Sequence, residues 1–204
     1  MKRKIPCLCD NTFSVEAPEE INLDEQGEYM DEIMNGTFMN YTCPSCGKKH
    51  KPEFPLTVLW PGRNARLEVI PEQERGEFYR RKKNPEKTET VIGYPELAER
   101  IAVLRDKLEP MVIETLKYYL LLKAQETYPD EEIYIWYQNR GPEGLEFHIH
   151  GIKPGEIAVT QIPMALYEKT LADYTKHPRS EIFTSLRFGS YLSVQNTIRL
   201  ESVK

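Results

Sequence analysis

Residues 41–50 read Tyr41-Thr42-Cys43-Pro44-Ser45-Cys46-Gly47-Lys48-Lys49-His50 and hold two of the four cysteines of the chain. The other two lie in Pro6-Cys7-Leu8-Cys9, so residues 10–42 separate a Cys-x-Cys pair from a Cys-x-x-Cys pair. Short alternating segments flank both pairs, which predicts a β-hairpin with the cysteines at its turn in each case. Gly47 is expected to take the positive φ that the second turn requires.

Two close pairs of thiols in one short region are typical of a tetrahedral zinc site. We therefore predict that Cys7, Cys9, Cys43 and Cys46 bind one Zn2+. Redox chemistry at the second pair and burial of free thiols remain alternatives. The redox interpretation is less favoured, because the residues after Cys46 do not open a helix that would activate a thiolate. His50 is a further candidate ligand.

The composition excludes several classes of protein. The chain has 204 residues, 40% of them hydrophobic and 29% charged, which indicates a folded globular protein rather than a disordered tail. The net charge of -5 argues against broad, non-specific affinity for nucleic acid or anionic lipid.

The amino-terminal residues do not resemble a secretory signal. Met1-Lys2-Arg3-Lys4 is basic, but Pro6, Cys7 and Cys9 follow where an apolar segment would be needed. The longest apolar run, residues 118–122, is far shorter than the roughly 20 residues that span a bilayer. We expect a cytoplasmic protein with no membrane contact, in a compartment where thiols stay reduced.

The hydrophobic pattern predicts an α+β fold. An amino-terminal zinc-ribbon-like part with β-hairpins and a short helix between the cysteine pairs is followed by helices and an antiparallel sheet. The predicted elements are a helix at about 24–34, a hairpin from Phe54 to Ile70, helices at 94–109 and 111–126, a meander over 133–162, a helix at 163–176, and strands near 182–188 and 191–200. The predicted domains are a zinc-ribbon-like module at 1–74, a charged linker or arm at 75–93, and a helical and antiparallel-sheet region at 94–204.

This ordered set of features, from Ile5 to Lys123, resembles the CpXC-domain proteins. The matching features are the cysteine pairs, the acidic helix that ends in Asn35-Gly36-Thr37-Phe38, the strand through Pro55-Leu56, and the helix that contains Glu96-Leu97-Ala98-Glu99-Arg100-Ile101. The resemblance implies a zinc-binding ribbon carried by Cys7, Cys9, Cys43 and Cys46, and it implies no particular activity. The first pair departs from the Cys-Pro-x-Cys spacing typical of the family, since one residue separates its thiols.

A second group of possible metal ligands lies in the predicted meander. Glu146, His148 and His150 alternate with apolar residues, so on a strand all three point to one face. Two histidines and a carboxylate are a ligand set for a catalytic metal, which makes a metal-dependent hydrolase an alternative function. A solvated strand face explains the same alternation without chemistry, and we favour that interpretation.

A basic stretch suggests another alternative, a nucleic-acid-associated zinc ribbon. Its basic and aromatic residues are Arg63, Arg66, Arg75, Arg80, Arg81, Lys82, Lys83, Trp60, Phe78 and Tyr79. Such a mixture suits a phosphate backbone and stacked bases, but interspersed glutamates weaken the local field. We favour a solvated charged arm over nucleic-acid contact.

The sequence therefore favours a zinc-binding structural or interaction module over an enzyme. Four thiolates saturate a tetrahedral ion and leave no position for substrate or water. The expected partner is another protein, whose identity the sequence does not specify.

Overall fold

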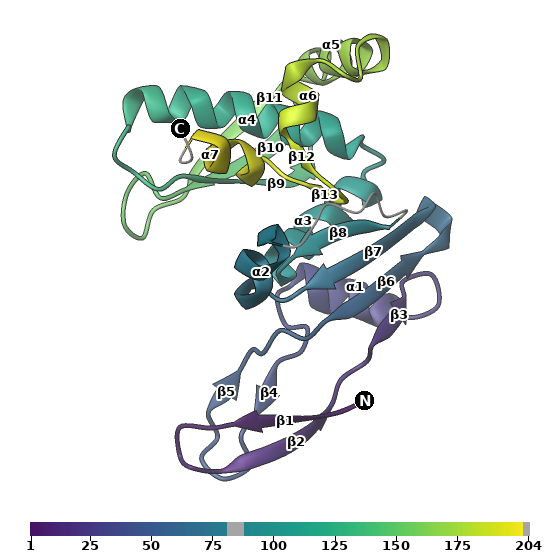
Figure 1. The fold of residues 1–204 in the computed structure, drawn as a ribbon, viewed down its shortest axis with the longest axis vertical. Coiled ribbons are helices and arrows are strands. Elements are labelled where there is room, and N and C mark those ends of the chain that lie inside the picture. Colours follow the sequence, from purple (N-terminus) through teal and green to yellow (C-terminus); the bar gives the residue numbers. More distant parts are fainter. Residues whose placement is uncertain (81–87, 202–204) are drawn as a thin grey trace. The chain divides into compact units, whose positions relative to one another are not determined.

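The computed structural model describes residues 1–80 and 88–201 (Figure 1). It confirms the predicted α+β fold, with strands at the amino-terminal end and both helices and strands after them. No helix in these two ranges is long and apolar enough to cross a membrane.

The chain divides into two compact units. The first comprises Met1–Lys82 and Glu86–Ala98, and the second comprises Lys83–Pro85 and Glu99–Lys204. The boundary between Ala98 and Glu99 falls inside helix α3 (Tyr94–Arg105), so this helix contributes residues to both units.

The first unit is built mainly from short strands. Its elements are β1 (Lys2–Pro6), β2 (Thr12–Glu16), β3 (Glu20–Asn22), α1 (Gly27–Met34), β4 (Tyr41–Thr42), β5 (Lys49–His50), β6 (Leu56–Trp60), β7 (Ala65–Ile70), α2 (Arg75–Arg80) and β8 (Glu89–Ile92), with 3₁₀ turns at Pro61–Arg63 and Glu72–Glu74. Strands β1 and β2 form one antiparallel hairpin and β4 and β5 another. Figure 1 shows both hairpins at the same end of this unit, which confirms the predicted plan of two cysteine-bearing hairpins.

Besides the two hairpins, the first unit contributes four strands to a separate sheet. These four lie in the order β8-β7-β6-β3, where β6 and β7 are antiparallel and the two outer pairs are parallel. The predicted hairpin from Phe54 to Ile70 is present as β6 and β7, and Asn64 in its turn takes the left-handed conformation at φ 49°. Leu56, Val58, Leu67 and Val69 are all at least 97% buried and form the core of this sheet.

Part of the predicted arm at 75–93 is regular structure instead. Residues 75–80 form α2, and residues 89–92 form the buried strand β8, in which Val91 and Ile92 are 2% and 0% exposed. The sequence prediction missed β8 because four residues are too few to show a strand period among charged neighbours. The rest of the arm, residues 81–87, lies outside the described residues.

The second unit packs helices against an antiparallel meander. Its elements after α3 are α4 (Pro110–Thr127), β9 (Tyr134–Arg140), β10 (Leu145–His150), β11 (Ala158–Ile162), α5 (Met164–Lys176), α6 (Glu181–Ser185), β12 (Arg187–Phe188), β13 (Tyr191–Leu192) and α7 (Gln195–Glu201). The sheet order β11-β10-β9 confirms the predicted meander, and α4 packs on β9 and α5.

Helix α4 matches the helix that the sequence predicted at 111–126. Every residue from Met111 to Lys117 is buried. Pro110 stands at its start, where the missing N–H costs nothing, and the side chain of Glu109 accepts a hydrogen bond from the Met111 amide at 3.3 Å.

The two strands predicted near 182–188 and 191–200 are wrong for most of their length. Helices α6 and α7 occupy much of these segments, and only the two-residue strands β12 and β13 remain. Phe183 and Leu186 are three residues apart and both buried, a spacing that puts two side chains on the same side of a helix but on opposite faces of a strand.

Candidate metal centre

The structure brings all four cysteines together. Their sulfur atoms all lie within 4.8 Å of one another. The Sγ atoms of Cys7 and Cys46 are 3.6 Å apart, and those of Cys9 and Cys43 are 3.7 Å apart. A disulfide needs about 2.05 Å, whereas two sulfurs bound to one tetrahedral zinc at about 2.3 Å lie about 3.8 Å apart. These two distances therefore match those of a tetrahedral thiolate site.

Each pair of cysteines is held in a hydrogen-bonded turn. In the first turn the Cys7 amide donates to the Asn11 carbonyl at 2.8 Å, and the Asp10 amide donates to the Cys7 carbonyl at 3.1 Å. In the second turn the Cys43 amide donates to the Lys48 carbonyl at 2.9 Å. Gly47 has φ 72°, which confirms the predicted need for glycine there.

We call residues 7–11 and 43–48 the first and second knuckles. The first knuckle accommodates its shorter Cys-x-Cys spacing by directing Leu8 outward, so that this side chain is 84% exposed. The spacing that departs from the family pattern therefore still brings both sulfurs to the cluster.

The four thiols have unequal surroundings. Cys7 and Cys43 are buried, whereas Cys9 and Cys46 are exposed. Each buried sulfur has a polar side chain beside it: Nδ2 of Asn11 donates to Cys43 Sγ at 3.8 Å, and Nε2 of His50 lies 3.2 Å from Cys7 Sγ. Such contacts orient metal ligands and stabilise the negative charge of thiolates. His50 contacts the Cys7 sulfur and does not belong to the four-residue cluster.

The thiol pKa values reflect the closeness of the four sulfur atoms and their hydrogen bonds. Burial raises the pKa of Cys43, but hydrogen bonds from the backbone of Cys46 and Ser45 outweigh it and lower the pKa from 9.0 to about 6. The backbone of Lys48 lowers the pKa of Cys46, yet the nearby sulfurs of Cys9 and Cys7 raise it to about 12. One thiolate thus forms readily while its neighbours oppose a second, and a dication at the centre would remove that repulsion.

Comparison with known proteins identifies the family. The family model described as "CpXC protein" matches residues 5–117, which include both knuckles. The chain belongs to the CpXC family.

A full-length relative of this CpXC protein is an "Uncharacterized protein" of Treponema pallidum (strain Nichols). The two are 29% identical over 214 residues, which cover 95% of this chain and 97% of the relative. No solved structure matches the chain.

The second group of predicted ligands in the CpXC protein does not form a comparable cluster. Glu146, His148 and His150 alternate along β10 as expected, and His148 Nε2 lies 3.1 Å from Glu146 Oε1. Asn139 also donates to Glu146, at 3.5 Å. Among the residues that the structure describes, the four cysteines are the only group of three or more possible ligands brought within reach of one ion.

The basic and aromatic residues of the predicted nucleic-acid stretch are partly engaged elsewhere. Trp60 is only 7% exposed, and the guanidinium of Arg63 lies 5.5 Å from its ring centre. The ring of Trp60 is therefore not a stacking platform for a base. Arg81, Lys82 and Lys83 lie outside the described residues.

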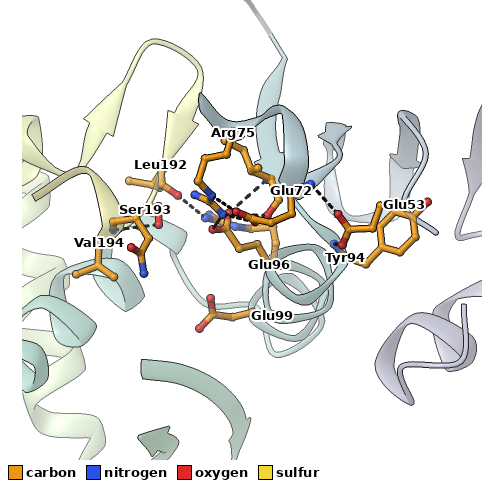
Figure 2. A network of polar contacts seen from close by, with 12 residues as sticks. Glu53, Glu72, Arg75, Tyr94, Glu96, Glu99, Leu192, Ser193 and Val194 are labelled. Atoms are coloured by element: carbon orange, nitrogen blue, oxygen red, sulfur yellow. Dashed lines mark hydrogen bonds and ion pairs between the residues drawn. The ribbon is translucent and has the colours of Figure 1, made fainter. Parts of the chain in front are cut away.

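Arg75 belongs to a polar network of the first unit rather than to a solvated arm (Figure 2). Its guanidinium donates to Glu72 Oε1 at 2.5 Å and to Glu96 Oε1 at 2.8 Å. Glu53 accepts the backbone amides of Glu72 and Tyr94 at 2.6 and 2.9 Å. These contacts tie the start of α3 to the turn before α2.

A buried ionic cluster in the second unit was not predicted. Lys117 Nζ donates to Glu99 Oε2 at 2.7 Å and to Glu114 Oε1 at 3.1 Å, and all three residues are at least 93% buried. Glu99 also accepts the Tyr137 amide at 2.6 Å, and Glu114 accepts the Val194 amide at 2.7 Å. The cluster therefore fixes β9 and the segment after β13 to α3 and α4.

Burial dominates the ionisation of Glu99. Loss of solvent raises its pKa from 4.5 to about 7, although the charge of Lys117 acts in the opposite direction. The contacts of Glu99 are with backbone and with other members of the cluster, which indicates a structural role.

Proposed function

We propose that this CpXC protein is a zinc-binding structural and interaction module, in which one Zn2+ held by Cys7, Cys9, Cys43 and Cys46 joins the two knuckles. The observation that supports the proposal is the set of sulfur–sulfur distances, because 3.6 and 3.7 Å are close to the edge of a zinc tetrathiolate. Soft thiolate ligands in tetrahedral arrangement favour zinc or iron over hard cations such as Mg2+ or Ca2+.

We call the two hairpins with their knuckles the ribbon. The ion would supply folding free energy that the ribbon otherwise lacks. Strands β4 and β5 have two residues each, and Cys9 and Cys46 are exposed, so this end of the first unit buries few apolar side chains. Structural zinc sites commonly offset such a deficit, because binding occurs only in the folded state.

The structural role proposed for the ion is also the reason to favour binding of a partner over catalysis. Four protein thiolates complete the coordination of a tetrahedral ion, so no position is left for water or substrate. The function of the ribbon then lies in the surface that it presents to a protein partner.

A second candidate, nucleic-acid binding, has one observation in its favour. Several lysines are exposed on the strands and turns of the ribbon, namely Lys2, Lys4, Lys48, Lys49 and Lys51. The net charge of -5 for the whole chain opposes this alternative, and we keep the protein partner as the proposal.

The proposal is tested by elemental analysis of the full-length protein purified under reducing conditions. We expect one zinc per chain in the wild type and in the Ser45→Ala control, and loss of zinc in Cys46→Ser. Protein that is folded with four free thiols and carries no zinc would contradict the proposal. Iron in place of zinc would correct the identity of the ion.

A further inference from the structure

The unequal exposure of the four thiols has a chemical consequence, which rests on the proposed zinc site. Cys9 and Cys46 are exposed, and each has a buried sulfur within 3.7 Å, that of Cys43 and that of Cys7 respectively. We propose that Cys9 and Cys46 are oxidation sites for hydrogen peroxide, and that their oxidation expels the zinc and links the two knuckles by Cys7–Cys46 and Cys9–Cys43 disulfides.

Exposure and side-chain contacts determine which sulfurs react first. Zinc-bound thiolates remain nucleophilic, and a peroxide reaches only those that solvent reaches. Cys7 and Cys43 are shielded by burial and hold the contacts from His50 and Asn11. A hydrogen bond to a thiolate lowers its nucleophilicity, so both factors direct the oxidant to the other two sulfurs.

The reaction is balanced for each pair. The Cys46 thiolate attacks the O–O bond of the peroxide, an S–O bond forms, and hydroxide leaves with the sulfur as a sulfenic acid. The Cys7 thiolate then attacks that sulfur, the S–S bond forms, and a second hydroxide leaves. Two thiolates lose two electrons, and one peroxide takes up two protons to give two waters. A second peroxide oxidises Cys9 and Cys43 in the same way.

Ring size favours bonds between the knuckles over bonds within them. A Cys7–Cys9 disulfide would enclose only Leu8, and so small a ring strains disulfide geometry. If Cys43 and Cys46 bonded to each other, Cys7 and Cys9 would have no other partner. Oxidation of all four thiols without the strained ring therefore requires two bonds between the knuckles. The contacts at 3.6 and 3.7 Å select Cys7–Cys46 and Cys9–Cys43.

This outcome differs from simple loss of zinc. Two disulfides between the knuckles would hold the hairpins together after the ion has left, and a reductant would restore the thiolates that bind it again. The ribbon would then exchange one cross-link for another in response to peroxide.

The experiment uses the full-length zinc-loaded protein titrated with hydrogen peroxide. Zinc release is followed with a chromogenic chelator, and the disulfides are mapped by mass spectrometry without reduction. Trypsin cannot separate the knuckles, because no Lys or Arg lies between Lys4 and Lys48, but cleavage after glutamate can, because Glu16 and Glu32 lie between them. We expect one zinc released per chain at two equivalents of peroxide, with peptides from the two knuckles linked.

Trapping in the zinc-loaded wild type identifies the site of attack. With dimedone present and less than one equivalent of peroxide, the sulfenic acids should be labelled on Cys46 and Cys9. Labelling of Cys7 or Cys43 would overturn the assignment.

The results separate this inference from the proposed function. Absence of zinc before oxidation contradicts the zinc site itself. A zinc-loaded protein that keeps its ion under peroxide, forms a Cys43–Cys46 bond, or yields sulfonic acids without disulfides contradicts only the inference.

Discussion

Asn11 is a side chain that supports the cysteine cluster without belonging to it. Its Nδ2 donates to the sulfur of Cys43 at 3.8 Å, while its carbonyl accepts the Cys7 amide at 2.8 Å. The side chain thus contacts one knuckle and the backbone shapes the other. A substitution at this position removes only the first of these contacts.

We predict that Asn11→Ala weakens zinc binding by about tenfold, because loss of a hydrogen bond to a ligand typically costs 10- to 100-fold in affinity. Competition with a chelator of known affinity measures the change. Ser14→Ala, an exposed change on β2, serves as the control. Equal affinity in the two variants would show that the Asn11 contact has no part in metal binding.

The buried Lys117 allows a prediction about the stability of the second unit. Its ammonium lies between the carboxylates of Glu99 and Glu114 in a site from which solvent is excluded. Lys117→Met leaves both carboxylates without this partner, so we expect a loss of ~3–5 kcal/mol in the free energy of unfolding. Urea unfolding followed by the helical circular dichroism signal measures it.

The control for this change is Lys123→Met on the same helix, where the lysine is exposed. Its effect should stay within about 0.5 kcal/mol. A similar small effect of Lys117→Met would mean that the buried cluster does not stabilise the second unit.

Individual residues show which parts of the candidate site could be predicted from the sequence. The cysteines were predicted because four thiols have few other uses at such spacing, and the structure brings them together. Glu99 and Lys117 are 18 positions apart on different helices, and each resembles an ordinary surface charge in the sequence. Only tertiary packing makes them a pair. Asn11 could not be singled out either, since its role depends on the second knuckle.

The two units should depend on the proposed zinc to different degrees. Hairpins β1–β2 and β4–β5 contribute the knuckles, whereas α4 belongs to the second unit and has its own buried core. We predict that chelation of zinc under reducing conditions increases amide hydrogen exchange in these four strands and leaves α4 protected. Hydrogen exchange followed by mass spectrometry tests this. Protection that persists in the hairpins would mean that they fold without metal.

Strand β10 provides a test of the alternative metal site. Its Glu146, His148 and His150 share one face, but the structure groups only the cysteines as a set of three or more ligands in the described part of the chain. We predict that replacing all three residues by alanine leaves one zinc per chain and a wild-type fold, measured by elemental analysis and circular dichroism. Loss of a second ion, or of a hydrolytic activity found in the wild type, would restore the hydrolase hypothesis.

Prediction of elements succeeded where segments were long and periodic, as in α4 and the meander β9–β10–β11. It failed for β8, where Val91 and Ile92 follow a charged segment and pair in parallel with the distant strand β7. Their burial depends on neighbours that a local pattern does not contain. The same limit applies to α6 and α7, which are too short for their period to be distinguished from that of a strand.

The charge of the whole molecule bears on its choice of partner. Several lysines are exposed on the ribbon, but the chain as a whole has a net charge of -5, which repels a polyanion at long range. We predict no measurable affinity for single-stranded DNA or RNA at about 150 mM salt, in fluorescence anisotropy with labelled oligonucleotides.

A salt-dependent rise in anisotropy would reverse this expectation. The matched variant is then Lys48→Gln with Lys49→Gln, which removes two exposed charges from the second knuckle. A weaker response in that variant would place the contact on the ribbon and favour the nucleic-acid alternative.

The proposed zinc joins Cys9 and Cys43 across residues 10–42, a segment that contains β2, β3, α1 and β4. The entropy that such a cross-link removes from the unfolded chain grows only with the logarithm of the loop length, so doubling the segment changes it by about 0.6 kcal/mol. The free energy of closing the site therefore depends only weakly on the number of residues between Cys9 and Cys43. Lengthening or shortening the segment between the knuckles by a few residues should leave the affinity for zinc nearly unchanged.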